Sequence, residues 1–438
     1  MRVTYYGQAC TLVEAAGRRI LTDPWLTEGA YLGTWFHTHV LAEAGVSPAT
    51  ICKDIDYLVL SHEHEDHCDV TTLNAFPRNL PILICRFATA KFRQYLTGLG
   101  FVDIRELNSG EPADLGDGLE VVILGSAEYT NDAAVLITGD GHTVFNETDC
   151  KLDYQDLEML RGRNIDLGFY MFSGANWFPM LYDNPPEVKL EQVRRRRRSL
   201  VRGFVERVKL TRPRIAVPAA GPCTVLDPDL LWLNSREHGI FIDPDDAVAA
   251  VRAANLGVEA VNMAATDVWD SERGIERHAP DSFRLPRDEY IAMAAARYAD
   301  AIRARKEQEP AAGADLPERL TAFFEHHVAA QTPAMRQRIG AVIGLDVSGR
   351  QGGQYTVDFT SPAPPYVREG LSPNWTYRIN VEDKVIYPFM SGEIPFLEDL
   401  FLTLRVQLAR RPDVYNEALY HFLYEPDPKK LEQWYASR

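Results

Sequence analysis

Residues 57–69 read YLVLSHEHEDHCD, and the rest of the chain is organised around this stretch. Its first four residues form an apolar run that predicts a short buried strand. His62 and His64 are two positions apart, so on an extended segment both imidazoles point to the same side. Asp66 and His67 follow on the next turn. This spacing predicts a site for one or two first-row transition metal ions, and the alternative is a solvated, histidine-rich loop.

Length and composition indicate a globular protein of more than one domain. The chain has 438 residues, which favours two or three domains. Hydrophobic residues make up 46% and charged residues 25% of the sequence, as in soluble proteins. No apolar run reaches about 18 residues, so no transmembrane span is expected. The start of the sequence lacks the pattern of a signal peptide.

Cysteine spacing and net charge argue against a thiolate metal site and against a nucleic-acid partner. The six cysteines are scattered without a Cys-x-x-Cys pair, which predicts reduced thiols in a cytoplasmic protein and no thiolate metal site. The formal charge of −16 disfavours nucleic acid as a partner, because contacts with phosphates need a basic surface.

Strands that end in acidic residues indicate where the other side of a site would come from. The strand predicted before Asp23 ends in a carboxylate that either supports the metal loop or caps a turn. Two more acidic loops, 126–132 and 146–150, follow the predicted strands 119–124 and 143–146. Repeated strands of this kind, alternating with helices, predict an α/β sandwich with a site along its rim.

Other features of the middle region leave alternatives open. His37 and His39 could be metal ligands, but with no other cluster nearby they are expected to be substrate-side or structural residues. Residues 173–179 fit a ligand-binding wall or a tight turn. Residues 194–214 contain nine Arg and one Lys against one Glu. This basic block either binds an anionic substrate or acidic partner, or it is a solvated helix face.

Composition also predicts the division of the chain. We expect a catalytic domain over residues 1–305, a linker at 306–316 and a small α+β domain over 317–438. The linker is indicated by the sequence EQEPAAGAD, which is rich in Pro, Gly and Ala.

His62-x-His64-x-Asp66-His67 resembles the metal motif of the metallo-β-lactamase superfamily. The resemblance implies an αββα sandwich in which His62 and His64 bind one metal and Asp66 and His67 the other. Asp149 falls where that family has a bridging aspartate. The third ligand of the first metal, usually His, is expected from the loop 126–132, which contains none. Glu128 is the predicted substitute, and His142 is a weaker one.

A closer resemblance covers nearly the whole chain. It is to the cytidine monophosphate-N-acetylneuraminic acid hydroxylases, without their Rieske iron–sulfur domain. The matching stretches are 141–150 (GHTVFNETDC), 174–179 (GANWFP), 213–221 (PRIAVPAAG) and 402–422. The C-terminal part resembles the sterol-carrier-like module of such relatives. Where relatives place a His before Pro, this chain has Asp227, with His238 as a fallback ligand; the Rieske ligands are absent.

These resemblances, together with the carboxylates, predict a dinuclear iron monooxygenase. Oxygen-rich ligation favours iron or manganese over zinc. The enzyme is expected to use dioxygen to hydroxylate an anionic small molecule, with Asp66 and Glu128 in catalytic roles. A separate ferredoxin or Rieske protein would supply electrons. The alternative is a zinc or manganese hydrolase of an ester, amide or phosphodiester, and a third interpretation is a binding protein with a vestigial site.

Overall fold

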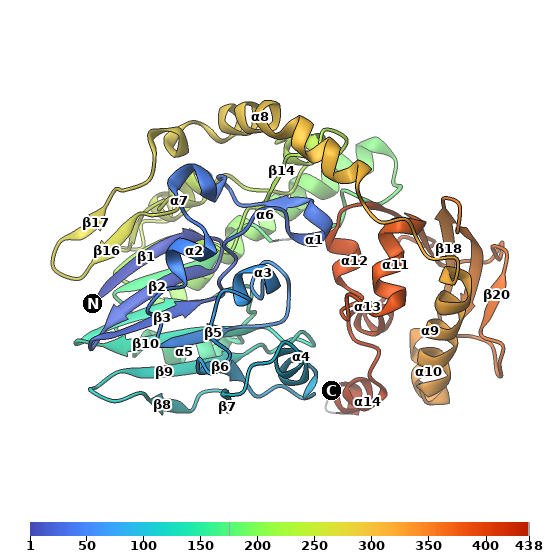
Figure 1. Cartoon of the computed structure of the whole chain (residues 1–438), viewed down its shortest axis with the longest axis horizontal. Helices are drawn as coiled ribbons and strands as arrows, with labels where there is room; N and C mark the ends of the chain where they lie inside the picture. Colours follow the sequence, from blue (N-terminus) through green and yellow to red (C-terminus); the bar gives the residue numbers. More distant parts are fainter. Residues whose placement is uncertain (175, 437–438) are drawn as a thin grey trace. The chain divides into compact units, whose positions relative to one another are not determined.

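The computed structural model describes residues 1–174 and 176–436 (Figure 1). It divides the chain into two compact units. The first consists of Met1–Ala175 and Val193–Ala299, and the second of Asn176–Gln192 and Asp300–Arg438. The sequence-based division differs in two respects: it extended the catalytic domain to residue 305, and it did not assign 176–192 to the C-terminal part.

The first unit is built on two large β-sheets. In spatial order the first sheet contains β17 (Gly274–Glu276), β16 (Val268–Asp270), β1 (Arg2–Gly7), β2 (Cys10–Ala15), β3 (Arg18–Thr22), β5 (Tyr57–Leu60), β6 (Ile82–Cys85) and β7 (Ile104–Leu107). The second contains β15 (Glu259–Ala260), β13 (Ile215–Ala219), β12 (Leu167–Met171), β11 (His142–Asn146), β10 (Ala133–Gly139), β9 (Glu120–Gly125) and β8 (Pro112–Asp114). A small ribbon joins β4 (Trp35–Phe36) to β14 (Thr224–Val225).

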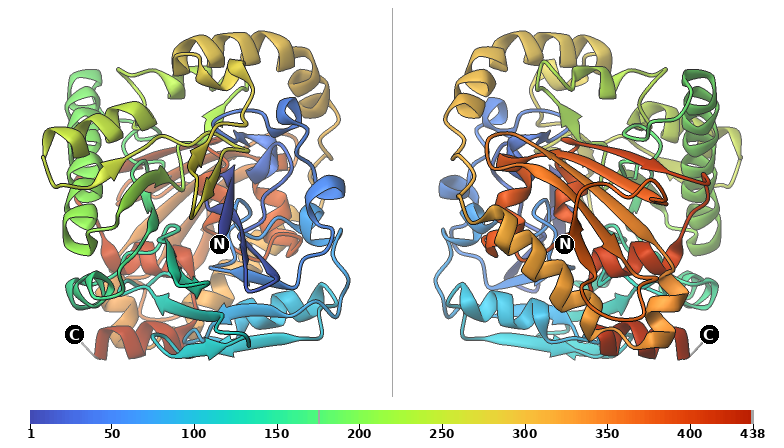
Figure 2. Two further views of the ribbon diagram at one scale, coloured as in Figure 1. Left: turned by 90° about the vertical axis from the view of Figure 1, so that its left-hand side faces the viewer. Right: turned by 90° about the vertical axis from the view of Figure 1, so that its right-hand side faces the viewer.

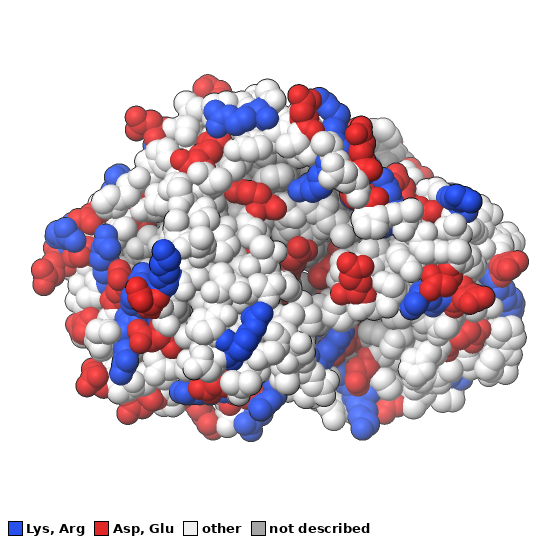
Figure 3. Space-filling model, viewed as in Figure 1, with Lys and Arg blue, Asp and Glu red and all other residues white. Residues whose placement is uncertain are grey.

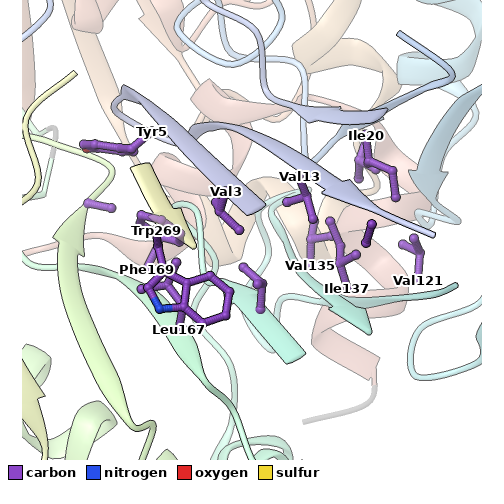
Figure 4. Close-up of a cluster of buried hydrophobic side chains, with 14 of the residues drawn as sticks. Val3, Tyr5, Val13, Ile20, Val121, Val135, Ile137, Leu167, Phe169 and Trp269 are labelled. Atoms are coloured by element: carbon purple, nitrogen blue, oxygen red, sulfur yellow. The ribbon is translucent and has the colours of Figure 1, made fainter. Parts of the chain in front are cut away.

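The inner faces of the two sheets enclose the main core. Alternate residues of each strand point inward, as the two-residue period of a strand requires. Val13 and Ile20 of the first sheet meet Val135 and Phe169 of the second, and Trp269 closes one side (Figure 4). All five side chains are buried. Burial of these apolar side chains is the main force that holds the sheets together.

Helices cover the outer faces of the sheets. A second apolar cluster joins the outer face of the second sheet to α5 (Tyr154–Arg161), α7 (Pro244–Ala253) and residues 200–210 of α6 (Pro186–Thr211). On the first sheet, α3 (Val70–Leu73) and α4 (Lys91–Gly98) lie beside β5–β7 (Figure 1). Shorter helices are α1 (Ala30–Gly33) and α2 (Pro48–Ile51), and α8 is Arg287–Glu307. This arrangement confirms the predicted α/β metallo-β-lactamase sandwich.

Strand direction determines where the site forms. β3, β5 and β6 run parallel, so their carboxyl ends share one edge of the first sheet. The loop 61–67 leaves β5 at this edge, next to Asp23 at the end of β3. In the second sheet β11 and β12 are parallel, and the loop that contains Asp149 follows β11.

The second unit contains a five-stranded sheet (Figure 2). Its order is β20 (Val367–Glu369), β19 (Gly353–Asp358), β18 (Val342–Ser348), β21 (Tyr377–Glu382) and β22 (Val406–Arg410). Its helices are α9 (Leu316–Ala330), α10 (Pro333–Ile339), α11 (Asp383–Ser391), α12 (Asp399–Leu402), α13 (Glu417–Tyr424) and α14 (Pro428–Ala436). The unit is α+β as predicted, and its likeness to sterol carriers stays a prediction.

Residues 176–192 join the second unit through backbone pairing and aromatic packing. The Asp183 N–H donates to Leu408 O at 2.7 Å, and the Leu408 N–H donates to Leu181 O at 2.9 Å. Trp177 stacks on Phe401 with ring centroids 5.0 Å apart. The segment therefore extends the sheet beside β22. Within 173–179, Ala175 lies outside the described residues.

The predicted linker at 306–316 is held by polar contacts. Arg405 forms a two-pronged ion pair with Glu309, with one N–O distance of 2.9 Å, and the Tyr387 hydroxyl donates to Asp315 at 3.0 Å. Both contacts lie within the second unit, which explains why the unit begins before the predicted boundary at 317.

Two surface-related features can be described: the distribution of charged side chains and the hydropathy of the helices. Figure 3 shows acidic and basic side chains interspersed over the viewed face. Among the residues that the structure describes, no helix is both long enough and apolar enough to cross a lipid bilayer.

Substitution of Phe169 by Ala should destabilise the first unit by about 3–5 kcal/mol, because it leaves a cavity in the core between the sheets. Denaturant titration followed by circular dichroism would measure the loss. Val102 is 76% exposed, so Val102→Ala should change stability by less than about 0.5 kcal/mol. Equal effects of the two substitutions would contradict the assignment of the core.

Candidate metal centre

A buried carboxylate, Asp23, holds the metal loop. It accepts hydrogen bonds from the Ser61 backbone N–H at 2.7 Å and from the Ser61 hydroxyl at 2.6 Å. Its second oxygen also lies 2.8 Å from His67 Nδ1. The carboxylate thus fixes which imidazole nitrogen of His67 remains to face the site, as partners of metal-binding histidines do. Asp23 therefore supports the loop, the first of the two roles considered for it.

Two groups of side chains have the geometry to hold metal ions, and they share His62. The first is His62, His64 and Asp132; the second is His62, His67 and Asp149. In each group the candidate ligand atoms lie within 4.8 Å of one another, as ligands around one ion of about 2.0–2.2 Å bond length do. His62 Nε2 is 2.8 Å from His64 Nδ1 and 3.9 Å from Asp132 Oδ1. His67 Nε2 is 3.8 Å from Asp149 Oδ1.

The electrostatics of these groups suit a cation. Burial and the neighbouring His67 and His64 hold the pKa of His62 well below its usual value, so this imidazole is neutral and ready to ligate. Burial raises the pKa of Asp149, and the carboxylates of Asp66 and Asp132 raise it further. Carboxylates that repel one another in a buried site are stabilised by a positive ion between them. The residues present therefore fit the metal pair that the motif implies.

Asp66 adjoins the second group without belonging to it. Its Oδ2 lies 3.6 Å from His67 Nε2, and its Oδ1 accepts a short hydrogen bond of 2.5 Å from the Tyr31 hydroxyl. The Tyr31 backbone N–H donates to the neighbouring Glu65 at 2.6 Å. The segment around Tyr31 therefore anchors the metal loop from outside, a contact that the sequence analysis did not foresee.

Glu128 is not placed where the sequence analysis expected it. Its side chain is 53% exposed and lies 3.9 Å from Lys151 Nζ at the surface. Asp132, from the same loop, takes the predicted third position beside His62 and His64. The loop thus places a carboxylate beside the two histidines, but this carboxylate is that of Asp132 and not that of the predicted Glu128. Asp132 directly precedes β10, and its position next to the start of a strand was the available signal.

The remaining candidate ligands lie outside both groups. Asp227 is buried, and its carboxylate accepts the Asp229 backbone N–H at 3.0 Å. His142 Nδ1 is 3.2 Å from Asp166, and the half-exposed side chain of His238 is 3.8 Å from Glu237. Thus neither Asp227, His142 nor His238 joins a ligand group among the described residues.

Part of the basic block has a structural role. Arg207 of α6 forms a 2.8 Å ion pair with the fully buried Glu147. Glu147 also accepts the Met171 backbone N–H at 2.9 Å. Because Glu147 is two residues before Asp149, this ion pair anchors the turn that carries the second group's carboxylate. Arg197 donates to the Phe241 carbonyl. These two arginines are therefore committed to internal contacts.

His37 and His39 are buried and stacked. His37 lies on Trp25 with ring centroids 3.9 Å apart, and His39 lies on Phe283 at 4.5 Å. Burial lowers the pKa of each imidazole to about 3, so both are neutral. Neither residue belongs to a metal group.

Comparison with known proteins agrees with this fold. The family model described as a beta-lactamase superfamily domain matches residues 2–125. A Mycolicibacterium smegmatis protein named as a Rieske 2Fe-2S iron-sulfur protein is 29% identical over 96% of this chain and 84% of its own length. The cytidine monophosphate-N-acetylneuraminic acid hydroxylase of Asterias rubens is 20% identical over 99% of this chain and 66% of its own.

Among solved structures, CmlA, a diiron beta-hydroxylase from Streptomyces venezuelae, aligns with a TM-score of 0.41 and 20% identity. The alignment covers 60% of this chain and 53% of that one. Residues 2–125 thus resemble the beta-lactamase superfamily domain, and the chain resembles the hydroxylases in sequence, as the motifs predicted.

Substitution of Asp132 by Ala should lose about one metal ion per chain, since it removes one ligand of the first group. Glu128→Ala should leave the stoichiometry unchanged, because Glu128 faces solvent. Elemental analysis of both purified variants would measure this. Loss of a metal in Glu128→Ala alone would restore Glu128 as the ligand.

Asp23→Asn should weaken metal binding by about 10–100-fold, because the amide no longer supplies the charged acceptor for His67. Competition with a chelator would measure the affinity. Asp69 is a matched control: it is buried near the same loop but caps α3 through Thr71 and Thr72. Asp69→Asn should affect stability more than affinity, and equal affinity losses in both variants would reject a specific role for Asp23.

Proposed function

We propose that the chain is a dinuclear non-heme iron monooxygenase that hydroxylates a C–H bond of an anionic small molecule. The observation that carries the proposal is the carboxylate content of the centre. Asp132, rather than an imidazole, completes the group of His62 and His64. Asp149 and Asp66 add two more carboxylates beside His67. Each group thus contains two histidines and one carboxylate, a ligand set typical of non-heme iron sites.

The reaction balances as R–H + O₂ + 2 e⁻ + 2 H⁺ giving R–OH + H₂O. Bound iron would supply the activation of dioxygen. Electrons would come from a ferredoxin or Rieske protein, since the six scattered cysteines of this chain include no Cys-x-x-Cys pair of the kind that holds an iron–sulfur cluster. The relative named as a Rieske iron-sulfur protein and the hydroxylase relatives support this class of donor and reaction.

Residues of the chain would position the centre and handle protons. Asp23 holds His67 through Nδ1 and so presents Nε2 to the site. The Tyr31 hydroxyl donates a hydrogen bond to Asp66 Oδ1 at 2.5 Å. This pair is therefore the proposed point of proton delivery to the site. The catalytic role predicted for Asp66 is kept here, and the one predicted for Glu128 is withdrawn because its side chain faces solvent.

Hydrolysis is the second candidate function. Its support is the match of residues 2–125 to the beta-lactamase superfamily domain. A zinc or manganese pair lowers the pKa of a bound water so that it attacks an ester, amide or phosphodiester. The neutral imidazole of His62 suits zinc as well as iron.

Metal content and oxygen consumption separate the two functions. We expect about two irons per chain in protein from iron-replete cells, near-UV absorption from ferric iron, and oxygen uptake when NADPH, ferredoxin reductase and ferredoxin are added. Two zinc ions without oxygen uptake would contradict the proposal. Asp132→His should raise the zinc-to-iron ratio, because it replaces an oxygen ligand by nitrogen. Glu128→His at the surface is the matched control and should leave the ratio unchanged.

A further inference from the structure

The first unit contains a cavity of about 830 Å³, within the size range of sites for small organic ligands. None of the residues of the two metal groups lines it. Its walls combine aromatic and charged side chains from distant parts of the sequence. Tyr5, His37, His39, Phe283, Arg284 and Arg287 are among the lining residues.

Arg287 is the unusual member of this wall. The residue is only 7% exposed and forms no ion pair among the described residues, although the carboxylates of Asp243 and Asp288 act on it from a longer distance. Its terminal nitrogens make long contacts with the carbonyls of Asn234 at 3.4 Å and Cys223 at 3.3 Å. Its Nε is buried without a hydrogen-bond partner. A buried cation is costly unless an anion pairs with it.

The other charged side chains on the wall are ion-paired, hydrogen-bonded or exposed. Arg277 and Arg284 both pair with the buried Asp267, at 2.9 and 2.6 Å. Asp243 pairs with Arg236 at 3.1 Å, and Asp245 accepts from Asn262 at 2.9 Å. Arg252 donates to the Ala260 carbonyl, and Glu259 is exposed. Arg287 is therefore the buried lining cation that forms no ion pair among the described residues, whereas Arg252 is exposed.

The surroundings of Arg287 suit the organic part of a ligand. The neutral imidazole of His37 lines the cavity, and its ring nitrogens have no well-aligned partner. Phe283 stacks on His39 and offers an apolar surface in the same wall. Gly7 leaves room for His37, since a Cβ at this position would lie 3.2 Å from His37 Nδ1.

We propose that this cavity binds a small organic anion, whose carboxylate or phosphate pairs with Arg287 and whose apolar body lies against Phe283. The ligand is a different chemical class from the metal ions, and its site does not share residues with theirs. The site stands whether the metal centre performs oxygenation or hydrolysis.

Calorimetric titration of the metal-loaded protein with benzoate, phenyl phosphate and benzamide would test the proposal. Benzamide has the shape of benzoate without its charge. We expect saturable binding of one anion per chain, at least tenfold tighter for benzoate or phenyl phosphate than for benzamide. The comparison of benzoate with phenyl phosphate identifies which anionic group the site prefers. Equal affinity for benzoate and benzamide, or no saturable binding of either anion, would overturn the proposal.

Substitutions of single residues would test whether the anion binds in this cavity. Arg287→Met should abolish the preference for the anion, and Arg287→Lys should restore part of it. Arg277→Met is the matched control, since Asp267 already neutralises Arg277, and it should keep the preference. His64→Ala should lose metal but retain benzoate binding. If benzoate binding disappears with the metal in His64→Ala, the anion binds the metal centre and the cavity assignment is wrong. That variant decides the question even if Arg287→Met does not fold.

Discussion

The site depends first on the carboxylate of Asp23. Buried at the end of β3, it accepts both donors of Ser61 and lies in hydrogen-bond contact with His67. A buried carboxylate is tolerated only when hydrogen-bond donors replace its hydration. The loop supplies these donors, and the same hydrogen bonds fix the conformation of the loop. The backbone at Asp23 has φ of 38°, a region in which Asp and Asn are more common than other non-glycine residues. The end of β3 and the beginning of the metal loop are thus one structural element.

The other half of the centre comes from the second sheet. His62, His64 and His67 follow β5 in the first sheet, whereas Asp132 precedes β10 and Asp149 follows β11. The ligands meet only because the core between the sheets sets their separation. The Glu147–Arg207 ion pair adds an anchor on the side of Asp149. Packing of the sheets is therefore a condition for metal binding, and a loosened core would reduce affinity without any change in a ligand.

The sequence predicted what is encoded locally. The strand 57–60 and the imidazoles after it follow from the apolar run and the spacing, whereas Asp149 was indicated by the family resemblance as a bridging ligand. In the structure Asp149 belongs to one ligand group, and His62 is the residue that the two groups share. The choice between Glu128 and Asp132 depends on how a loop turns. The Ser126 hydroxyl accepts the Glu128 backbone N–H, and the Thr130 hydroxyl donates to the Asp132 carboxylate. Neither contact can be predicted from the composition of the loop. Likewise, residues 176–192 join the second unit by pairing with Leu408, a contact between distant parts of the sequence.

The cavity was beyond prediction for the same reason, since His37 and Arg287 are far apart in the sequence. Its electrostatics are opposite to those of the metal centre. Around His67 the carboxylates of Asp66, Asp23 and Asp149 outweigh the effect of burial and raise the pKa of that imidazole to about 10, which marks a region that favours positive charge. The guanidinium of Arg287 forms no ion pair among the described residues, and burial lowers its pKa to about 10. Two regions of opposite potential in one unit would keep a metal ion and an organic anion in separate sites.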